Sequence, residues 1–259
     1  RNAILMYHSV GEEYPDGRIL TEETFRKQLE YLTANFRVVD LPDVINPADT
    51  ERRVALTFDA GYENFYTEIF PILKEFDLPA TQFIIPERIG VTNEKVDSES
   101  LWIEWFDFMD EEQLQELADS DLVTIGNKSL THTSILPAIR DEETLQREVG
   151  GGKKRLQELF DVPVERYCYG SGRFDPKSVE VVSEHHEYGV ITIPRFIDES
   201  VDLPTLPRID MDFTDVETFK RKLTRRFERT KKINAVFGRI VGGWHPDGYA
   251  RLREADPDI

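Results

Sequence analysis

The sequence predicts an α/β fold in which parallel strands alternate with crossover helices and close into a single (β/α) barrel. Short apolar runs alternate with amphipathic helical segments along most of the chain. The length of 259 residues is normal for one barrel and long for one open sheet. No internal repeat and no linker rich in Gly, Ser or Pro divides the chain. We expect a barrel of seven strands or of otherwise irregular closure.

The elements follow from the spacing of apolar residues. Pro71 is expected to bend or divide the second helix, because proline cannot donate the helical hydrogen bond. We assign residues 1–210 to the barrel, and residues 211–259 to a basic amphipathic helix and a tail that pack on it or extend from it. Strands are predicted at 3–8, 37–41, 54–58, 80–85, 122–126, 166–169 and 188–193, and helices at 22–36, 62–76, 111–118, 141–160 and 176–186.

The composition limits the partners. A net charge of −18 repels nucleic acid and anionic membranes over most of the surface. No run of about 18 apolar residues is present, so no transmembrane helix is predicted. The chain starts without methionine or a leader pattern, so we expect any targeting segment to be removed or never present. The single cysteine, Cys168, excludes an internal disulfide. An acidic surface poor in lysine favours a high-salt source, with a cytoplasmic or cell-surface location left open.

Several features have a structural and a functional interpretation. The basic segment 220–232 is either a solvated helix paired with the acidic body or a docking surface for an anionic surface or a protein partner. Aromatic residues within 102–108 either cap the barrel or stack on sugars. His185 and His186 come late in a predicted helix, where a structural role is expected. His245 lies among turn residues of the tail.

Polar side chains follow the predicted strands at the end where barrels carry their chemistry. His8 and Asp59 each come directly after a strand, and Arg208 lies in the segment "LPRI". Two further loops, 126–132 and 169–175, follow later strands. One of these residues alone would indicate little. Their joint occurrence at successive strand ends predicts one functional rim.

Four segments at these strand ends resemble the motifs of a known family. "VALTFDAGYENF" resembles the first motif of the polysaccharide deacetylases (carbohydrate esterase family 4, with the NodB-homology domain), which usually reads T-F-D-D-G. "IGNKSLTH" resembles the second motif, H-[ST]-x-x-H, and "YCYGSGRFD" resembles the third. "LMYHSV" resembles exopolysaccharide deacetylases, in which the histidine of the catalytic acid precedes the first motif. The resemblance extends over about residues 3–210.

The resemblance implies a role for each matching residue. Asp59 matches the general base, His8 the general acid, and Arg208 an arginine that orients the base. His132 matches the second histidine ligand of a divalent metal, which in the family is zinc or a similar ion. The turn that shapes the oxyanion and substrate site in the family matches Tyr169, Gly170, Ser171 and Gly172.

The sequence departs from the family at the metal. Ala60 stands where the ligand aspartate is expected, and Lys128 stands where the first ligand histidine is expected. A catalytic zinc usually has three protein ligands, so His132 alone predicts no bound cofactor. In formal charge, loss of the metal, loss of a carboxylate and gain of an ammonium cancel. We therefore hypothesise that Lys128 replaces the metal and pairs with Asp59; the alternative is that Lys128 points to solvent.

Three functions remain open at this point. The first is a hydrolase that removes an acetyl group from a glycan, as the resemblance implies. The second is a non-catalytic relative that binds a glycan or a protein partner. The third is a metal-independent amide or imide hydrolase, with Asp59 as the base and Lys128 as an electrostatic stabiliser. The missing ligands favour the second function over the first, and an acetylated sugar is the expected partner.

Overall fold

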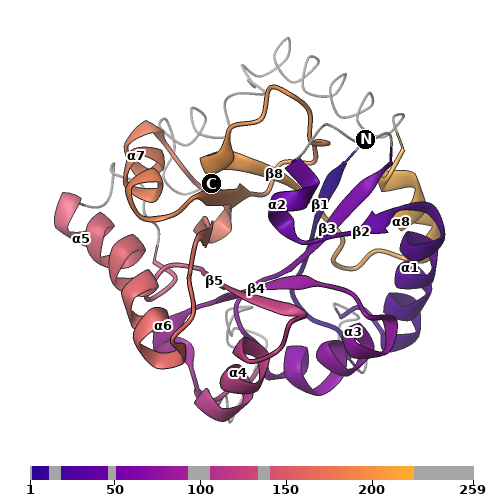
Figure 1. Ribbon diagram of the computed structural model, residues 1–259, viewed down its shortest axis with the longest axis horizontal. Coiled ribbons are helices and arrows are strands. Elements are labelled where there is room, and N and C mark those ends of the chain that lie inside the picture. The colour runs from indigo at the N-terminus through magenta and orange to yellow at the C-terminus, as the bar shows by residue number, and fades with distance from the viewer. Residues whose placement is uncertain (1, 12–18, 46–50, 93–105, 134–140, 225–259) are drawn as a thin grey trace, which may run out of the picture.

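The computed structural model describes residues 2–11, 19–45, 51–92, 106–133 and 141–224. Its strands form one parallel sheet, and a ring of helices surrounds it (Figure 1). The strands are β1 (Ala3–Tyr7), β2 (Arg37–Val38), β3 (Arg53–Phe58), β4 (Ala80–Ile84), β5 (Val123–Asn127), β6 (Arg166–Cys168), β7 (Tyr188–Ile191) and β8 (Leu206–Asp210).

The sheet closes because β1 pairs with strands on both of its sides. Ala3 is in register with Val54 of β3, and Ile4 is in register with Arg208 of β8. The remaining neighbours complete the order β1-β8-β7-β6-β5-β4-β3, which makes a closed ring of seven strands in the described part of the chain. The short β2 pairs only with the first residues of β3 and lies outside this ring. The predicted (β/α) barrel is therefore confirmed with seven strands, but one of them differs from the prediction. The predicted strand at 37–41 corresponds to β2, outside the ring, and β8, which was not predicted as a strand, completes the ring.

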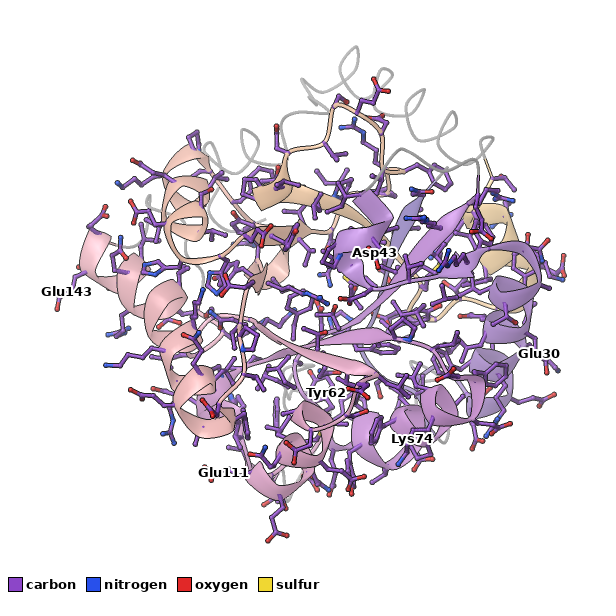
Figure 2. All side chains as sticks on the ribbon, in the orientation of Figure 1. Glu30, Asp43, Tyr62, Lys74, Glu111 and Glu143 are labelled. Carbon is purple, nitrogen blue, oxygen red and sulfur yellow. The ribbon has the colours of Figure 1, made fainter. Side chains whose placement is uncertain are left out.

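Most of the helices lie outside the barrel and bury one face against it, whereas the short α2 (Leu41–Ile45) lies over the strands (Figure 1). Glu30, Glu111 and Glu143 are exposed on the outer faces of three of them, whereas Tyr62 is buried (Figure 2). The α-helices are α1 (Glu22–Asn35), α2 (Leu41–Ile45), α3 (Phe70–Phe76), α4 (Glu111–Ala118), α5 (Glu142–Gln146), α6 (Gly152–Phe160), α7 (Pro176–His185) and α8 (Val216–Lys222).

Two predicted helices change their winding part of the way along. The predicted interruption at Pro71 is observed, because a π-helical turn, η1 (Phe65–Ile69), precedes α3. The predicted helix at 141–160 contains a second π-helical turn, η4 (Arg147–Gly151), which the sequence analysis did not anticipate. Close packing explains the glycines there: a Cβ on Gly150 would lie 2.6 Å from the His185 ring.

The segment after β8 packs into the same core as the barrel. Phe219 of α8 is fully buried, and its ring centroid lies 6.1 Å from that of Tyr31 on α1. Within the basic segment, Lys220 pairs with Glu217, and the remainder from residue 225 lies outside the described residues. Where the structure is described, no helix is both long and apolar enough to cross a membrane.

Candidate functional site

Asp59 lies at the centre of the predicted rim and is almost completely buried. It directly follows β3, its side chain is 1% exposed, and its backbone N–H donates to the Tyr7 carbonyl over 2.9 Å. Arg208, from the middle of β8, donates a hydrogen bond from each terminal nitrogen to the carboxylate, over 2.6 Å to Oδ1 and 2.9 Å to Oδ2. Such a bidentate salt bridge is strong and fixes the orientation of the carboxylate.

Lys128 supplies a second cation to the same carboxylate. Its Nζ lies 2.6 Å from Asp59 Oδ2, and its side chain is 5% exposed. The solvent-facing alternative for Lys128 is therefore wrong. Cys168 Sγ lies 3.4 Å from the same Nζ and 3.3 Å from Asp59 Oδ2. We call these four residues, Asp59, Lys128, Cys168 and Arg208, the Asp59 cluster.

The charges of the Asp59 cluster stabilise one another. Burial opposes ionisation of Asp59, but Arg208 and Lys128 outweigh it and hold the pKa of the carboxyl well below its usual value. Burial also disfavours the ammonium of Lys128, yet the charge of Asp59 prevails and raises the pKa of Lys128. Burial raises the pKa of the Cys168 thiol. The cluster therefore holds an anion between two cations at neutral pH.

The backbone after Asp59 keeps a conformation that suits other residue types better than alanine. Ala60 has φ +80°, in a region that L-residues rarely adopt, and its side chain is buried. Asn and Asp are enriched among non-glycine residues at positive φ. The next residue, Gly61, has φ +88°, and a Cβ there would lie 3.1 Å from Ile84 Cδ1. The turn thus keeps a geometry compatible with aspartate at position 60.

The loop after β5 is held by a buried carboxylate. Glu148 of η4 is fully buried and accepts hydrogen bonds from Ser129 Oγ (2.8 Å) and from the Thr131 backbone N–H (3.0 Å). Ser129 Oγ in turn accepts from the His132 backbone N–H over 3.1 Å. Sequence reasoning missed Glu148, because its helix is distant in sequence and no motif includes it. Both Ser129 (φ +64°) and His132 (φ +66°) are left-handed.

His132 lies near the Asp59 cluster and is partly buried. Burial, reinforced by the positive charge of Lys128, lowers the pKa of His132 to about 3. The imidazole is therefore neutral over the physiological range. A neutral imidazole could serve as a metal ligand, but the positive charge of Lys128 disfavours a cation beside it.

His8 forms a separate pair with an aspartate that the sequence analysis did not identify. Its Nδ1 lies 2.5 Å from Asp212 Oδ2, and its backbone N–H donates to Asp212 Oδ1 over 2.9 Å. Its Nε2 lies 3.8 Å from Asp59 Oδ2, and its side chain is 20% exposed. Asp212 follows β8 by two residues, so the same strand-end argument that found Asp59 could have found it.

The turn at 169–172 lies at the end of β6, where it was predicted. The backbone N–H of Tyr169 donates to the Val190 carbonyl over 3.2 Å, so the sheet uses this donor. The Gly172 N–H donates to the Tyr169 carbonyl over 3.0 Å and closes the 3₁₀ turn Gly170–Gly172, which includes Ser171. The predicted oxyanion role of this turn stays a prediction.

The other predicted residues have structural contacts. His186 is buried, and its Nε2 lies 3.3 Å from Asn127 Nδ2, while His185 Nε2 lies 2.6 Å from Gln146 Oε1. Phe106 and Phe108 are buried against Tyr62. The structural interpretation is therefore confirmed for these residues, whereas Trp102, Trp105 and His245 lie outside the described residues.

The side chains that the resemblance matches to the family's metal ligands do not form a ligand set. Ala60 contributes a methyl group, and the ammonium of Lys128 is a hydrogen-bond donor with no lone pair for a metal. Among the described residues, no group of three or more His, Cys, Asp or Glu side chains is placed to hold an ion. His132 is the one matching ligand that remains, and zinc sites normally need more.

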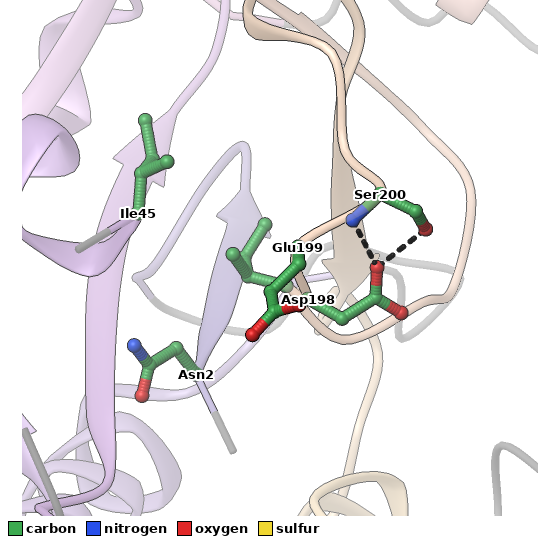
Figure 3. A pocket seen from close by; sticks show the side chains of 6 residues that line it. Asn2, Ile45, Asp198, Glu199 and Ser200 are labelled. Carbon is green, nitrogen blue, oxygen red and sulfur yellow. Dashed lines mark hydrogen bonds between the residues drawn. The ribbon is translucent and has the colours of Figure 1, made fainter. Parts of the chain in front are cut away.

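A separate pocket opens at the opposite end of the barrel. It has a volume of about 520 Å³ and is lined by Asn2, Ile45 and residues 197–200 (Figure 3). Asp198 Oδ1 accepts hydrogen bonds there from the backbone N–H and the Oγ of Ser200. These residues precede β1 and β8, so the pocket lies away from the strand ends that carry the Asp59 cluster.

Enzymes built on (β/α) barrels carry their active sites at the C-terminal rim, where the Asp59 cluster and the His8–Asp212 pair lie. The sequence model of the family described as polysaccharide deacetylase matches residues 46–189, which is more than half of the chain. The chain therefore belongs to the polysaccharide deacetylase family.

Individual relatives agree with this assignment. The poly-beta-1,6-N-acetyl-D-glucosamine N-deacetylase of Escherichia coli (strain K12) is 29% identical over 139 residues, which cover 48% of this chain and 20% of that protein. YxkH of Bacillus subtilis (strain 168), whose name places it among polysaccharide deacetylases, is 24% identical over 196 residues, or 74% of this chain. The chain spans 64% of the length of YxkH.

Solved structures share the fold. A polysaccharide deacetylase from Bacillus cereus superposes with a TM-score of 0.70 at 22% identity, covering 86% of this chain and 69% of that one. IcaB from Ammonifex degensii superposes with a TM-score of 0.71 at 20% identity, covering 85% of this chain and 94% of that one. At these identities the likeness establishes the fold alone.

Proposed function

We propose that this protein binds an N-acetylated glycan of the kind that its family processes and does not perform the family's metal-dependent hydrolysis. The ligand class follows from family membership and from relatives named as poly-beta-1,6-N-acetyl-D-glucosamine N-deacetylases. One observation carries the loss of hydrolysis: the carboxylate of Asp59 is buried and already bound by both Arg208 and Lys128.

A general base must reach the proton that it removes and must have a pKa near the working pH. Asp59 meets neither condition. Its side chain is 1% exposed, and its two cationic partners hold its pKa well below the usual range. Removing a proton from water would require Asp59 to exchange one of its charge-assisted hydrogen bonds for a weaker one. The base position thus supports a structural role.

Lys128 takes the electrostatic place of the metal. In the family's arrangement, a divalent ion would balance the carboxylates beside it. Here, one carboxylate is replaced by the methyl group of Ala60, and the ammonium of Lys128 lies 2.6 Å from the carboxylate that remains. A buried carboxylate without a nearby cation would cost several kcal/mol. The alanine at position 60 and the lysine at position 128 are therefore consistent with each other, because together they keep the charge of the site balanced without a metal.

A second candidate function is metal-independent hydrolysis of an amide. The observation in its favour is the intact His8–Asp212 pair, in which Asp212 fixes the orientation of the ring. A histidine held in this way can donate or accept a proton at Nε2. Metal-independent hydrolysis also requires a general base that activates water. Asp59 is poorly suited to this role, because it is buried and has a strongly lowered pKa.

One experiment separates the candidates. Purified protein would be mixed with a β-1,6-linked N-acetylglucosamine oligomer, and binding would be measured by calorimetry and acetate release by an enzymatic assay. The same samples would contain added zinc or EDTA. We expect binding without acetate release under either condition. Zinc-stimulated release would contradict the proposal, release insensitive to EDTA would support the second candidate instead, and absence of binding would exclude glycan recognition.

A further inference from the structure

Large apolar side chains are rarely exposed on this protein. In the described part of the chain, the exposed ones are Phe213, which is 53% exposed, and Leu203, which is 41% exposed. The two lie at opposite ends of the same strand. Leu203 belongs to the 3₁₀ turn Leu203–Thr205 that precedes β8, whereas Phe213 follows β8 on the rim that carries His8 and Asp59.

Phe213 is presented by a strained backbone. Its φ is +54°, which is a true outlier for a bulky residue. Such strain persists only where the surroundings enforce it, and it is found preferentially at binding and catalytic sites. Here it directs an apolar ring into water, which burial energetics alone would not favour.

The residues on both sides of Phe213 are fixed. Asp212 binds the backbone and ring of His8, and its own N–H donates to Asp210 Oδ1 over 2.8 Å. Thr214 is buried, and its carbonyl accepts from Gln28 Nε2 over 2.7 Å. The exposed ring is thus attached to a rigid turn and is directly adjacent in sequence to the partner of His8.

We propose that Phe213 is a stacking platform for one sugar ring of the glycan that binds beside the His8–Asp212 pair. This inference rests on the proposed glycan binding. A pyranose has an apolar face of C–H groups and a polar edge of hydroxyl groups. A rigid aromatic ring next to partly exposed polar side chains suits both, because it removes apolar surface from water while the polar groups determine orientation.

Phe213→Ala tests the platform, and Leu203→Ala is its matched control. Binding of the β-1,6-linked N-acetylglucosamine oligomer would be measured by calorimetry for both variants and for Phe213→Tyr, which keeps the ring. We expect Phe213→Ala to weaken binding by about tenfold, which corresponds to about 1.4 kcal/mol. Phe213→Tyr and Leu203→Ala should bind within about twofold of the unchanged protein.

The outcomes distinguish this inference from the proposed function. Equal binding by Phe213→Ala and the unchanged protein would overturn the platform and leave glycan binding intact. No binding by the unchanged protein would overturn both. Sedimentation of the same variants adds a further test: self-association that Phe213→Ala abolishes, without an effect on the glycan, would assign the ring to a second copy of this chain and overturn the platform. Both substitutions alter exposed side chains, so we expect both variants to fold.

Discussion

The Asp59 cluster and the His8–Asp212 pair are neighbours with opposite exposure. Asp59 Oδ2 and His8 Nε2 are 3.8 Å apart. The side chains of Asp59 and Lys128 are 1% and 5% exposed and are paired with each other. The side chain of His8, by contrast, is 20% exposed. The two halves of this rim thus have different properties: one is a sealed ion cluster, and the other remains partly exposed to solvent.

Under the proposed function, this difference shows how the loss of a metal turns part of an active site into a structural element. An ammonium inside the barrel can neutralise a carboxylate, but unlike a metal it brings no bound water to activate. Buried ion pairs contribute little net stability compared with apolar residues, yet removing one partner is costly. The Asp59 cluster should therefore affect folding strongly, and the His8–Asp212 pair should affect it weakly.

Asp59→Ala should produce the largest effect. It would leave the ammonium of Lys128 and the guanidinium of Arg208 buried without a counterion, so we expect a loss of about 3–5 kcal/mol in the free energy of unfolding. Urea denaturation followed by circular dichroism measures this quantity. His8→Ala is the comparison, with an expected loss of about 1 kcal/mol or less, because His8 is partly exposed. Equal losses in the two variants would contradict the proposed difference between the two halves.

Ala60→Asp combined with Lys128→His should convert the sealed half back into a metal site. Aspartate tolerates the left-handed backbone at position 60, and His132 already lies nearby. We expect the double variant to bind zinc, and zinc at about 100 times its Kd should raise the free energy of unfolding by about 2.7 kcal/mol. Calorimetric titration and thermal unfolding measure the two effects.

The two single variants are the controls for this conversion. Ala60→Asp alone places a second carboxylate beside Lys128, and Lys128→His alone leaves two histidines without the aspartate, so each should bind zinc much more weakly. No response of the double variant to zinc would mean that the loop carrying His132 is not positioned as the family resemblance requires. Tight binding by either single variant would show that other side chains complete the site.

The sequence was sufficient to predict the barrel, six of its seven strands and the residues of the Asp59 cluster other than Cys168. The seventh strand, β8, was not identified as a strand. Strand–helix alternation and polar residues after apolar runs are local signals, and parallel topology brings the strand ends together. The pairing of Lys128 with Asp59 was one of two alternatives that the charge argument left open, and the structure shows this one.

Contacts between segments distant in sequence could not be predicted in this way. The strand-end argument could have placed Asp212 at the rim, but not its pairing with His8 across 204 residues. Glu148 fixes a loop through hydrogen bonds that no periodic pattern encodes. The exposure of Phe213 was also unpredictable, because aromatic residues after a strand are usually buried. Its left-handed φ depends on the turn that follows β8, and turns are specified by packing on both sides.

The smallest expected effect is the contribution of His132 to the pH dependence of the free energy of unfolding. Folding lowers the pKa of His132 from 6.5, its ordinary value, to about 3. Between these two pH values only the unfolded chain takes up this proton. Stability is therefore full above pH 6.5 and falls as the pH decreases towards 3, by at most about 1.4 kcal/mol per pH unit for this group.

His132→Gln should reduce that slope, measured by urea denaturation in a pH series. Lys128→Met should reduce it less than His132→Gln, because burial lowers the pKa of His132 more than the charge of Lys128 does. An unchanged slope in His132→Gln would show that this imidazole is not held neutral beside Lys128.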